Sequence, residues 1–504
     1  MYTGRRVDLT AMLHVLSRTN LNKKFTSASS QIFRAGPLYR LTFTHGRAYR
    51  MGLLNSKFRC TRGPAPMNDV KRLRLALPLL LLLLTAPLGA QTRAALADSI
   101  RAILDEGIAA GAFPGAQVLV WHHGQPLLHV TAGYHTYDSL RATRPDDVYD
   151  LASVTKTSSA LLVLMQQYGA GQLDLNAPLG SLFPQLADTN KGATSLRSAL
   201  AHRAGLLPWV PYWQTTLRGE ARYPWKKGWD GSRTNDYRFR NRTIKRDSSR
   251  RFPIRLTDDM WLHRRYRERR IYRAIQDSPL KPPGTYEYSG LLFYLLPDYV
   301  ERTTGQDYRQ YLRDNFYDPL GATTLGYRPL DRGIPLDRIV PTEIDTFFRM
   351  DTLHGVVHDE GAAMMNGVSA NAGLFSSAED LAKLYQMLLD GGVYKGRRYL
   401  TEEAIAEFTR YQYAQEGNRR GLGFDKPLLH YDAQLSSVAE AAPPASFGHS
   451  GYTGTFVWAD PEHELLYVFL SNRVYPSRNR GAIYTLNVRP RIHTLLYSFI
   501  KRSE

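Results

Sequence analysis

Cysteine is almost absent from this chain of 504 residues, in which Cys60 is the single example. Cys60 lies in an upstream segment that we expect the mature protein to lack, so the folded part would contain no thiol. That excludes a disulfide scaffold, a cysteine nucleophile and a Cys-ligated zinc site. The histidines are dispersed, without the His-Glu-x-x-His spacing of metalloproteases, and we expect neither a metal site nor another cofactor.

Long apolar runs are also scarce, and the clearest one lies within MNDVKRLRLALPLLLLLLTAPLGA at residues 67–90. Three basic residues precede an almost unbroken apolar run from Leu75 to Leu84, and small residues follow it. This order predicts a secretory signal peptide that is cleaved after Ala90. A signal-anchor is the alternative, but the run is shorter than the ~20 residues of a membrane span. We therefore expect an exported protein, periplasmic or extracellular, with no stable membrane span after cleavage.

Acidic residues are rare before this leader. Residues 1–66 hold 12 Lys and Arg against one acid and show no periodic apolar pattern. Because a signal peptide is N-terminal, we expect translation to start at Met67 and residues 1–66 to be a disordered gene-model extension. The chain carries +19, but residues 1–90 hold 15 basic and 2 acidic residues, which leaves +6 (50 minus 44) for the rest. Because most of the positive charge lies in residues 1–90, we expect no nucleic-acid partner.

The expected domain, residues 91–504, has β-rich runs at both ends. GAQVLVWHHGQPLLHVTAGY and TGTFVWADPEHELLYVFLSN each predict a hairpin. We expect an α+β fold: one antiparallel sheet from both chain ends, flanked by helices, with a mostly helical inserted subdomain. The cleft between the two parts is the expected place of a functional site. Helical patterns occupy 92–113, 154–168, 195–202, 306–315, 379–390, 401–412 and 489–502.

One stretch differs in composition. Residues 233–273 are dense in Arg and Tyr, and we expect a solvated, partly helical excursion. The alternative is a basic rim that attracts an anionic substrate or envelope polymer.

The first chemical signal is DLASVTKTSSALLVLMQQ at residues 150–167, where Ser153 and Lys156 stand at the start of an apolar run. Residues three apart share a helix face, with Cβ atoms ~5–6 Å apart, so the amine can reach the hydroxyl. An amine kept neutral by burial or by a second cation can take the serine proton, and a helix N-terminus favours negative charge there. The alternative is a helix-capping serine beside an ordinary surface lysine, because S-x-x-K occurs often by chance.

Two later stretches add candidates. In KPPGTYEYSGLLFYLL, Tyr288 and Ser289 follow a Pro-Gly turn and precede an apolar helix. In FGHSGYTGTFVWADPE, His449 and Gly451 open the late strand. Ser450 in that stretch almost forms a G-x-S-x-G elbow, but a tyrosine replaces the last glycine and a strand follows, so it is a poor candidate nucleophile.

The ordered motifs S-x-x-K, Y-S-x and H-x-G resemble the serine β-lactamase and penicillin-binding protein superfamily. The likeness is greatest to its class C β-lactamase and D-alanyl-D-alanine carboxypeptidase-like branch, which includes many esterases. LAHRAGL at 200–206 and the segment 367–392 also resemble that branch, and the resemblance covers roughly 93–500. We expect His202, within LAHRAGL, to be a structural residue at a helix end.

The resemblance implies catalytic roles for four side chains. Ser153 would be the acylated nucleophile, Lys156 its proton partner and Tyr288 a second base. A phenol titrates near pH 10 unless cations lie beside it, and Lys156 and His449 are the expected cations.

It also implies a binding frame for the substrate. The backbone N–H groups of Ser153 and Tyr452 would form the oxyanion hole. Ser289 and Gly451 would contact the substrate.

Two departures from the family pattern bear on the substrate. Gly290 replaces the asparagine of Y-x-N, and His449 replaces the lysine of K-T-G. Both changes weaken anchoring of a substrate carboxylate. We expect an exported serine hydrolase that forms a covalent acyl-enzyme on Ser153 and acts on esters or on D-amino-acid amide or peptide bonds of envelope material, such as peptidoglycan fragments. The alternatives are a β-lactamase and a non-catalytic envelope-binding protein that keeps the fold.

Overall fold

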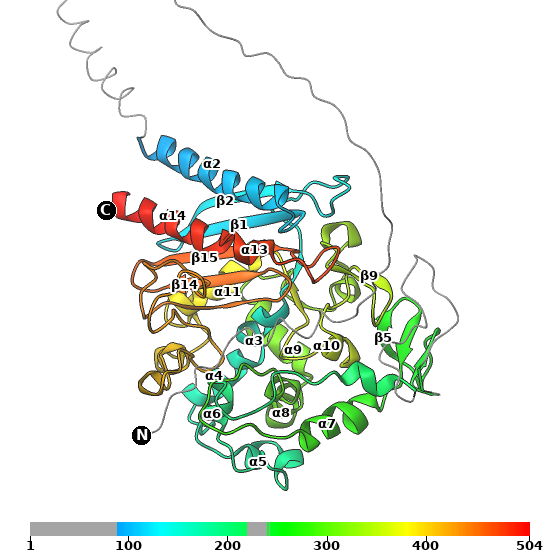
Figure 1. Cartoon of the computed structure of the whole chain (residues 1–504). Helices are drawn as coiled ribbons and strands as arrows, with labels where there is room; N and C mark the ends of the chain where they lie inside the picture. Colours follow the sequence, from blue (N-terminus) through cyan, green and yellow to red (C-terminus); the bar gives the residue numbers. More distant parts are fainter. Residues whose placement is uncertain (1–87, 219–238, 241, 504) are drawn as a thin grey trace, which may run out of the picture. The chain divides into compact units, whose positions relative to one another are not determined.

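The computed structural model describes residues 88–503, except 219–238 and 241 (Figure 1). The extension expected at 1–66 and most of the leader lie outside this part, so the start site and the cleavage site stay predictions. Helix α2 (Leu88–Ala109) begins two residues before Ala90, and cleavage after Ala90 would remove only its first turn. No helix in the described part has the length and hydropathy of a bilayer span.

A five-stranded antiparallel sheet joins the two ends of the chain (Figure 1). Its strand order is β13-β14-β15-β1-β2, and β1 pairs with β15 from Ala116 opposite Ser471 to His122 opposite Leu465. The two expected hairpins and their common sheet are confirmed. The strands are β1 (Gly115–His122), β2 (Gln125–Gly133), β13 (Phe447–Ser450), β14 (Phe456–Asp460) and β15 (Leu465–Ser471).

Both faces of this sheet are covered. Successive side chains of a strand point to opposite faces. Val118 and Val120 of β1 pack into the core beneath α2 and α14 (Val488–Ser503), whereas Leu119 and Trp121 belong to the core that contains α11 (Ala378–Leu389). In Figure 1, α2 and α14 lie on one side of the sheet and α11 lies on the other. The central strands are therefore mostly apolar, with buried polar side chains only at a few positions such as Gln117.

The middle of the chain is mostly helical, as expected, but two predicted helices are interrupted. The helix expected at 154–168 divides at Ser159 into α3 and α4, and the one expected at 306–315 widens after α9 into a π-helical turn. The helices of this region are α3 (Thr155–Ser158), α4 (Ala160–Gly169), α5 (Leu179–Leu182), α6 (Leu196–Leu200), α7 (Arg273–Asp277), α8 (Leu296–Thr304), α9 (Tyr308–Leu312), α10 (Glu360–Met364) and α12 (Glu402–Thr409), with α13 (Ala482–Thr485) near the C-terminus.

Short strands brace the helical part. One small sheet has the order β3-β10-β7, and two further pairs are β8 with β9 and β11 with β12. Their bounds are β3 (Tyr149–Asp150), β7 (Gly326–Tyr327), β8 (Glu343–Asp345), β9 (Asp351–Leu353), β10 (Leu374–Ser376), β11 (Val393–Tyr394) and β12 (Arg397–Arg398).

The Arg-rich stretch was expected to be a partly helical excursion, and the structure, which describes residues 239–273 of it except 241, shows a helical segment only at its end. It forms a small antiparallel sheet of order β4-β6-β5, followed by a helical segment at Arg267–Asp277. Its apolar residues alternate with polar ones, a period of two that the high arginine content hid from the sequence reading. The strands are β4 (Ile244–Lys245), β5 (Ile254–Thr257) and β6 (Met260–Leu262).

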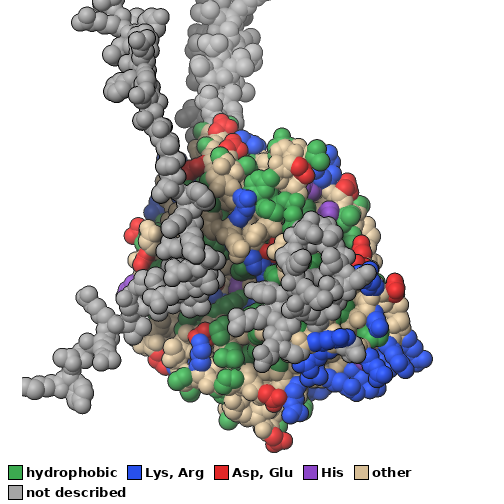
Figure 2. Space-filling view, turned by 45° about the vertical axis from the view of Figure 1, so that its right-hand side comes forward, with side chains coloured by type: hydrophobic (Ala, Val, Ile, Leu, Met, Phe, Trp, Pro, Cys, Tyr) green, Lys and Arg blue, Asp and Glu red, His purple; other side chains and the backbone are tan. Residues whose placement is uncertain are grey.

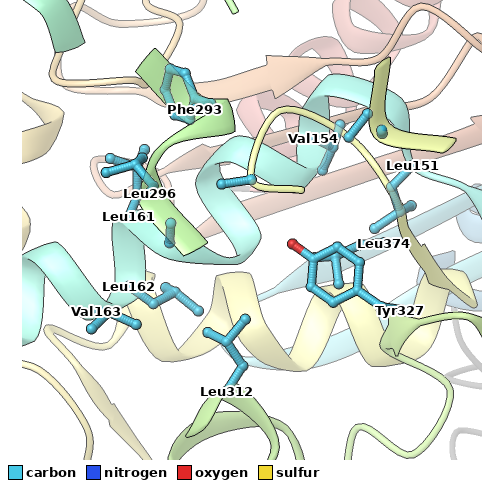
Figure 3. Packing of buried hydrophobic residues seen from close by; sticks show 14 of the residues in the cluster. Leu151, Val154, Leu161, Leu162, Val163, Phe293, Leu296, Leu312, Tyr327 and Leu374 are labelled. Carbon is cyan, nitrogen blue, oxygen red and sulfur yellow. The ribbon is translucent and has the colours of Figure 1, made fainter. Parts of the chain in front are cut away.

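The larger apolar core lies beneath the S-x-x-K segment (Figure 3). Leu151 and Val154, on either side of Ser153, are fully buried, and so are Leu161 and Leu162 of α4. Such a densely packed support leaves little freedom to the short turn that it carries.

His493 on α14 gives this fold a specific sensitivity to acid. It is buried between the rings of Tyr467 and Tyr497, with centroids at 5.3 and 4.8 Å, and burial lowers the pKa of His493 to about 3. An unfolded histidine titrates near pH 6.5, so below that pH the unfolded chain binds a proton that the folded chain excludes. The free energy of unfolding should therefore fall as pH decreases, by up to about 1.4 kcal/mol per pH unit for this residue.

We expect His493→Gln to flatten this fall when urea unfolding is followed from neutral to mildly acidic pH. His430→Gln, at an exposed position, is the matched control and should follow the wild-type slope. An unchanged slope in His493→Gln would contradict the assignment.

Candidate active site

Ser153 and Lys156 meet at the start of α3. Ser153 lies in a 3-10 turn, Ala152–Val154, and caps no helix, because the residue before α3 is Val154. Lys156 Nζ donates to Ser153 Oγ at 3.0 Å and to the Asn371 carbonyl oxygen at 3.0 Å, and its side chain is only 2% exposed. The capping serine beside a surface lysine is therefore not what the structure shows.

The turn before the serine is held by Asp150. Ala152 adopts a left-handed conformation, with φ of 45°, which costs a non-glycine residue about 1–2 kcal/mol. The Ala152 amide donates to Asp150 Oδ1 at 2.8 Å, and the His358 amide donates to Asp150 Oδ2 at 2.6 Å. The buried carboxylate thus fixes the turn and ties it to a segment more than 200 residues away in the sequence.

Tyr288 lies beside this pair. Its ring centroid is 5.2 Å from Lys156 Nζ and 5.5 Å from the guanidinium carbon of Arg420. The hydroxyl is buried and has no hydrogen-bond partner in the described part of the chain, a situation that costs about 1–3 kcal/mol. The Tyr288 oxygen is therefore available to form a hydrogen bond with a group that enters the site.

His449 lies against Tyr288, with ring centroids 6.0 Å apart, and is not among the residues that line the cavity described below. Its Nδ1 donates to the Ser450 carbonyl at 2.7 Å, which leaves Nε2 to accept from Arg420 Nη2 at 3.2 Å. Burial, and then the charges of Arg420 and Lys156, lower the pKa of His449 to about 3. The histidine is neutral, so the expectation that it supplies positive charge to Tyr288 is wrong.

Arg420 supplies that charge instead, and the sequence reading missed it. It is 2% exposed and pairs with Asp425, Nη1 to Oδ1 at 3.0 Å; Arg419 pairs with the same carboxylate. Burial alone would raise the pKa of Asp425, but the two guanidinium groups hold it below its usual value. The only sequence signal was a pair of arginines in the glycine-rich stretch GNRRGLGF, with nothing to connect them to Tyr288.

The loop after β13 is tied to the nucleophile segment by two threonines. Thr453 Oγ1 donates to the Asp150 carbonyl at 2.7 Å, and Thr455 Oγ1 donates to the Leu151 carbonyl at 2.9 Å. A Cβ at Gly451 would lie 2.5 Å from the Leu151 oxygen, so glycine is required for this close approach. Gly451, expected to contact the substrate, acts in this packing and is not among the cavity-lining residues.

Tyr452 does line the cavity, as Ser153 does. Arg473 donates to the Tyr452 carbonyl from Nε at 2.9 Å and from Nη2 at 2.6 Å, and thereby orients the end of that residue's peptide unit. Within the described residues, the Tyr452 amide has no hydrogen-bond acceptor. It is therefore available as a donor beside Ser153.

Ser289 differs from its expected role. Its hydroxyl donates to the Leu207 carbonyl at 2.6 Å, and its amide donates to His202 Nδ1 at 3.2 Å. The side chain is buried and does not line the cavity. Ser289 and His202 hold the Tyr288 segment in place, which fits the structural role expected of His202.

Gly290 leaves open the position where the family pattern has an asparagine. The nearest atom to a Cβ built there is Asn371 Cβ, at 3.8 Å. The carbonyl of Asn371 accepts from Lys156, and its side-chain amide donates to the Tyr294 hydroxyl at 3.2 Å. Asn371, which sequence reasoning did not single out, therefore holds the lysine through its carbonyl group.

These side chains surround one cavity of about 440 Å³. The residues that line it are Ala152, Ser153, Lys156, Pro208, Trp209, Tyr288, Gly290, Tyr294, His358, Asp359, Glu360, Asn371, Ala372, Tyr452 and Arg478.

A second cluster of charged side chains at this cavity contains more acidic than basic residues. Arg478 pairs with Glu343 at 2.5 Å and with Glu360 at 2.8 Å, and His358 bonds to Glu343 at 2.8 Å. Burial would raise the pKa of Glu343, but the hydrogen bonds from His358 and Arg478 hold it at about 2. One cation therefore faces two buried carboxylates here.

Asp359 adds a further negative charge. Its Oδ1 accepts from the Tyr294 hydroxyl at 3.0 Å and from the Ala362 amide at 2.7 Å. In the described part of the chain Asp359 has no ion-pair partner and Oδ2 no hydrogen-bond donor. The carboxylate is half-buried and lines the cavity, where it can receive a cationic group.

The chain is similar in sequence to known proteins. The sequence model of the β-lactamase family matches residues 100–488. An Escherichia coli (strain K12) protein with the provisional name D-alanyl-D-alanine carboxypeptidase is 29% identical over 345 residues, covering 65% of this chain and 69% of that protein.

Solved structures share the fold. EstCE1, described as a hydrolase with promiscuous acyltransferase activity, has a TM-score of 0.54 at 19% identity, over 79% of this chain and 98% of its own. D-amino acid amidase from Ochrobactrum anthropi SV3 has a TM-score of 0.52 at 18% identity, over 81% and 99%. With its family match across most of the folded chain, this protein belongs to the β-lactamase family and is a serine hydrolase of the superfamily that also contains the penicillin-binding proteins.

Proposed function

We propose that the protein is an exported serine acyl hydrolase that forms a covalent acyl-enzyme on Ser153. Its substrates are esters or D-amino-acid amide or peptide bonds of envelope material. The observation that carries the proposal is the 3.0 Å contact between Lys156 Nζ and Ser153 Oγ at a cavity that also contains the unpartnered phenol of Tyr288.

Acylation uses three side chains. Ser153 Oγ attacks the carbonyl carbon while its proton passes to Lys156 Nζ, which keeps its own N–H on the Asn371 carbonyl. Tyr288 gives its proton to the leaving oxygen or nitrogen, and Lys156 then returns a proton to the phenolate. Water attacks the acyl-serine in the second half, its proton passes to Lys156, and Lys156 restores the Ser153 hydroxyl.

The carbonyl oxygen gains negative charge in both steps. The backbone N–H groups of Ser153 and Tyr452 are the proposed donors to it, since both residues line the cavity and the Tyr452 amide is without an acceptor. Fixed donors of this kind commonly give the largest electrostatic contribution to such reactions.

The similar proteins favour D-amino-acid chemistry, because they include one named as a D-alanyl-D-alanine carboxypeptidase and a D-amino acid amidase. Asp359 supports the same direction. Its unpaired carboxylate would bind a protonated amine on the substrate, as in a D-aminoacyl amide or a peptide with a diamino acid.

β-Lactams are the less favoured substrates. Gly290 offers no side-chain amide, and the neutral, buried His449 offers no cation to a substrate carboxylate. A non-catalytic binding protein is also disfavoured, because such a protein would gain nothing from leaving the Tyr288 hydroxyl buried without a partner.

The first test removes the nucleophile. Ser153→Ala should lower kcat/KM at least about 10³-fold on a p-nitrophenyl ester and on a D-Ala-D-Ala peptide. Fluorophosphonate labelling, followed by intact mass, should also disappear. Ser450→Ala is the matched control and should keep both. Equal turnover by wild type and Ser153→Ala would sink the mechanism, and absence of turnover and label in folded wild type would favour the binding protein.

The second test concerns Asp359. Asp359→Asn keeps the acceptor for Tyr294 and Ala362 but removes the charge. We expect kcat/KM to fall about fivefold on D-alanine p-nitroanilide, as loss of a partly exposed ion pair costs about 1 kcal/mol. The N-acetylated substrate should be unaffected. Asp188→Asn, at an exposed position outside the cavity lining, is the control. An equal effect on both substrates would rule out amine recognition.

The third test separates Arg420 from its neighbour. Both Arg419 and Arg420 pair with Asp425, but only Arg420 contacts His449 and the Tyr288 ring. Arg420 is a positioning residue that acts through Tyr288. Its replacement by Gln should lower kcat by about 10- to 100-fold, which is within the range of an acid–base effect. Arg420→Lys should recover most of the rate, and Arg419→Gln should lose little.

Thermal unfolding must show that each variant is folded. Equal losses in Arg419→Gln and Arg420→Gln, or no rescue by lysine, would assign Arg420 a purely structural role.

A further inference from the structure

The described part of the Arg-rich stretch, 239–273, is strongly basic. It contains 13 Lys and Arg against 4 Asp and Glu, a net charge of +9 (13 minus 4). On the face that Figure 2 turns forward, Lys and Arg side chains gather densely at the lower right, on the side where β5 lies in Figure 1. The charge is thus concentrated on one part of the molecule.

The small sheet β4-β6-β5 holds this charge in a fixed position. Ile254, Leu256 and Leu262 are buried in the larger core, so the strands are anchored from below. The backbone amide of Arg264 donates to the Arg251 carbonyl at 2.9 Å. Main-chain packing therefore brings like charges together and prevents them from moving apart.

Most of these cations have no counter-charge among the residues that the structure describes. Ion pairs engage Arg255 with Asp258 and Arg273 with Asp277, whereas nine exposed cations form no ion pair with any described residue. His263 reports the resulting field: burial lowers its pKa, and the charges of Arg264, Arg269, Arg265 and Arg251 lower it further. We call these nine cations the basic face: Arg240, Arg242, Lys245, Arg250, Arg251, Arg264, Arg265, Arg269 and Arg270.

We propose that the basic face binds a flexible polymer with closely spaced phosphate groups. Like charges held together without carboxylate partners are relieved by an external anion. Of the 13 cations in 239–273, 12 are arginines, whose planar fork of donors binds phosphate oxygens in pairs, which lysine cannot do. Within the face, a hollow of about 440 Å³, lined by Arg240, Arg242 and Lys245 and also by the single acid Asp259, offers room for one such group.

Side-chain chemistry favours a polymer over a lipid surface or a nucleic acid. Elements that lie on a bilayer add large apolar side chains to their cations, and single-stranded nucleic acids stack their bases on exposed aromatic rings. Within 239–273, no described large hydrophobic or aromatic side chain is among the strongly exposed ones. The basic face is therefore suited to bind a partner through charge alone.

The face is also connected to the catalytic cavity. β5 packs against α10, and the residue that precedes α10 is Asp359, which lines the cavity. A polymer held by the face would therefore lie on the same rigid support as one wall of the cavity.

The test measures binding, so it does not depend on the proposed catalytic function. The probe is long-chain inorganic polyphosphate, titrated into the full chain at several salt concentrations. One variant carries Arg264→Gln, Arg265→Gln, Arg269→Gln and Arg270→Gln. The matched control removes the same charge from the terminal helices through Arg93→Gln, Arg101→Gln, Lys501→Gln and Arg502→Gln, all exposed positions. The cations upstream of residue 91 are common to all three proteins.

We expect the affinity of wild type to fall steeply with salt, by roughly 50-fold between 50 and 200 mM if about four phosphates are contacted. The basic-face variant should bind at least about tenfold more weakly at low salt, with the slope of log affinity against log salt reduced by about 1 to 2 from its expected value of about 2.8. The control should stay close to wild type in both respects.

Three results would overturn the proposal. The first is no binding of polyphosphate at low salt, and the second is an equal loss in the two variants, which would reflect net charge alone. The third is a preference for phosphatidylglycerol vesicles or for a single-stranded oligonucleotide over polyphosphate, which would assign the face to a membrane or to a nucleic acid.

Discussion

The buried carboxylate of Asp150 is the constraint on which the catalytic arrangement depends. Its two oxygens accept the amides of Ala152 and His358, and its carbonyl accepts the Thr453 hydroxyl. Three segments distant in sequence, which carry the nucleophile, the acidic part of the cavity and the proposed oxyanion donor, therefore meet at one residue. Burial raises the pKa of Asp150, and the two amide hydrogen bonds oppose that rise. A left-handed alanine beside the nucleophile can persist because its surroundings determine it from several sides.

Charge divides the cavity into two regions. Arg420 lies behind Tyr288 on the side of the nucleophile, whereas Asp359 and Glu360 line the other region together with Arg478, which also pairs with Glu343 outside the lining. This second region is rigid, because the fully buried Arg349 donates to the carbonyls of residues 357 and 358 at 2.6 and 2.5 Å. In a cavity with partly buried walls such opposed charges interact with a ligand more strongly than at an open surface. A substrate with charge at one end would be oriented by this field as well as by shape.

The sequence predicted what depends on local pattern. Alternating apolar residues and turn signals defined both hairpins, and the motif spacing brought out Ser153, Lys156 and Tyr288. It could not show what depends on packing between remote segments. Ser159 interrupts an apparently continuous helix, the Asn371 carbonyl receives the lysine, and Arg420 reaches Tyr288 from a loop with no motif. His449 was expected to be a cation because the sequence shows its position in the motif. The sequence does not show that the folded chain buries its side chain. Ser289 was assigned to the substrate for the same reason, although its hydroxyl is used by the backbone of residue 207.

The proposed binding by the Arg-rich stretch would add recognition without altering the chemistry of the cavity. None of the described residues of this stretch lines the catalytic cavity, yet its strands are anchored in the same core and β5 packs on the helix that follows Asp359. A charged surface acts over about a Debye length, roughly 8 Å at physiological salt, whereas the cavity acts only on contact. Capture by the basic face would thus raise the local concentration of a polymer-borne bond, and the cavity charges would then orient it. Mutations could change capture by the basic face and orientation in the cavity separately, because no charged side chain is shared between the basic face and the cavity.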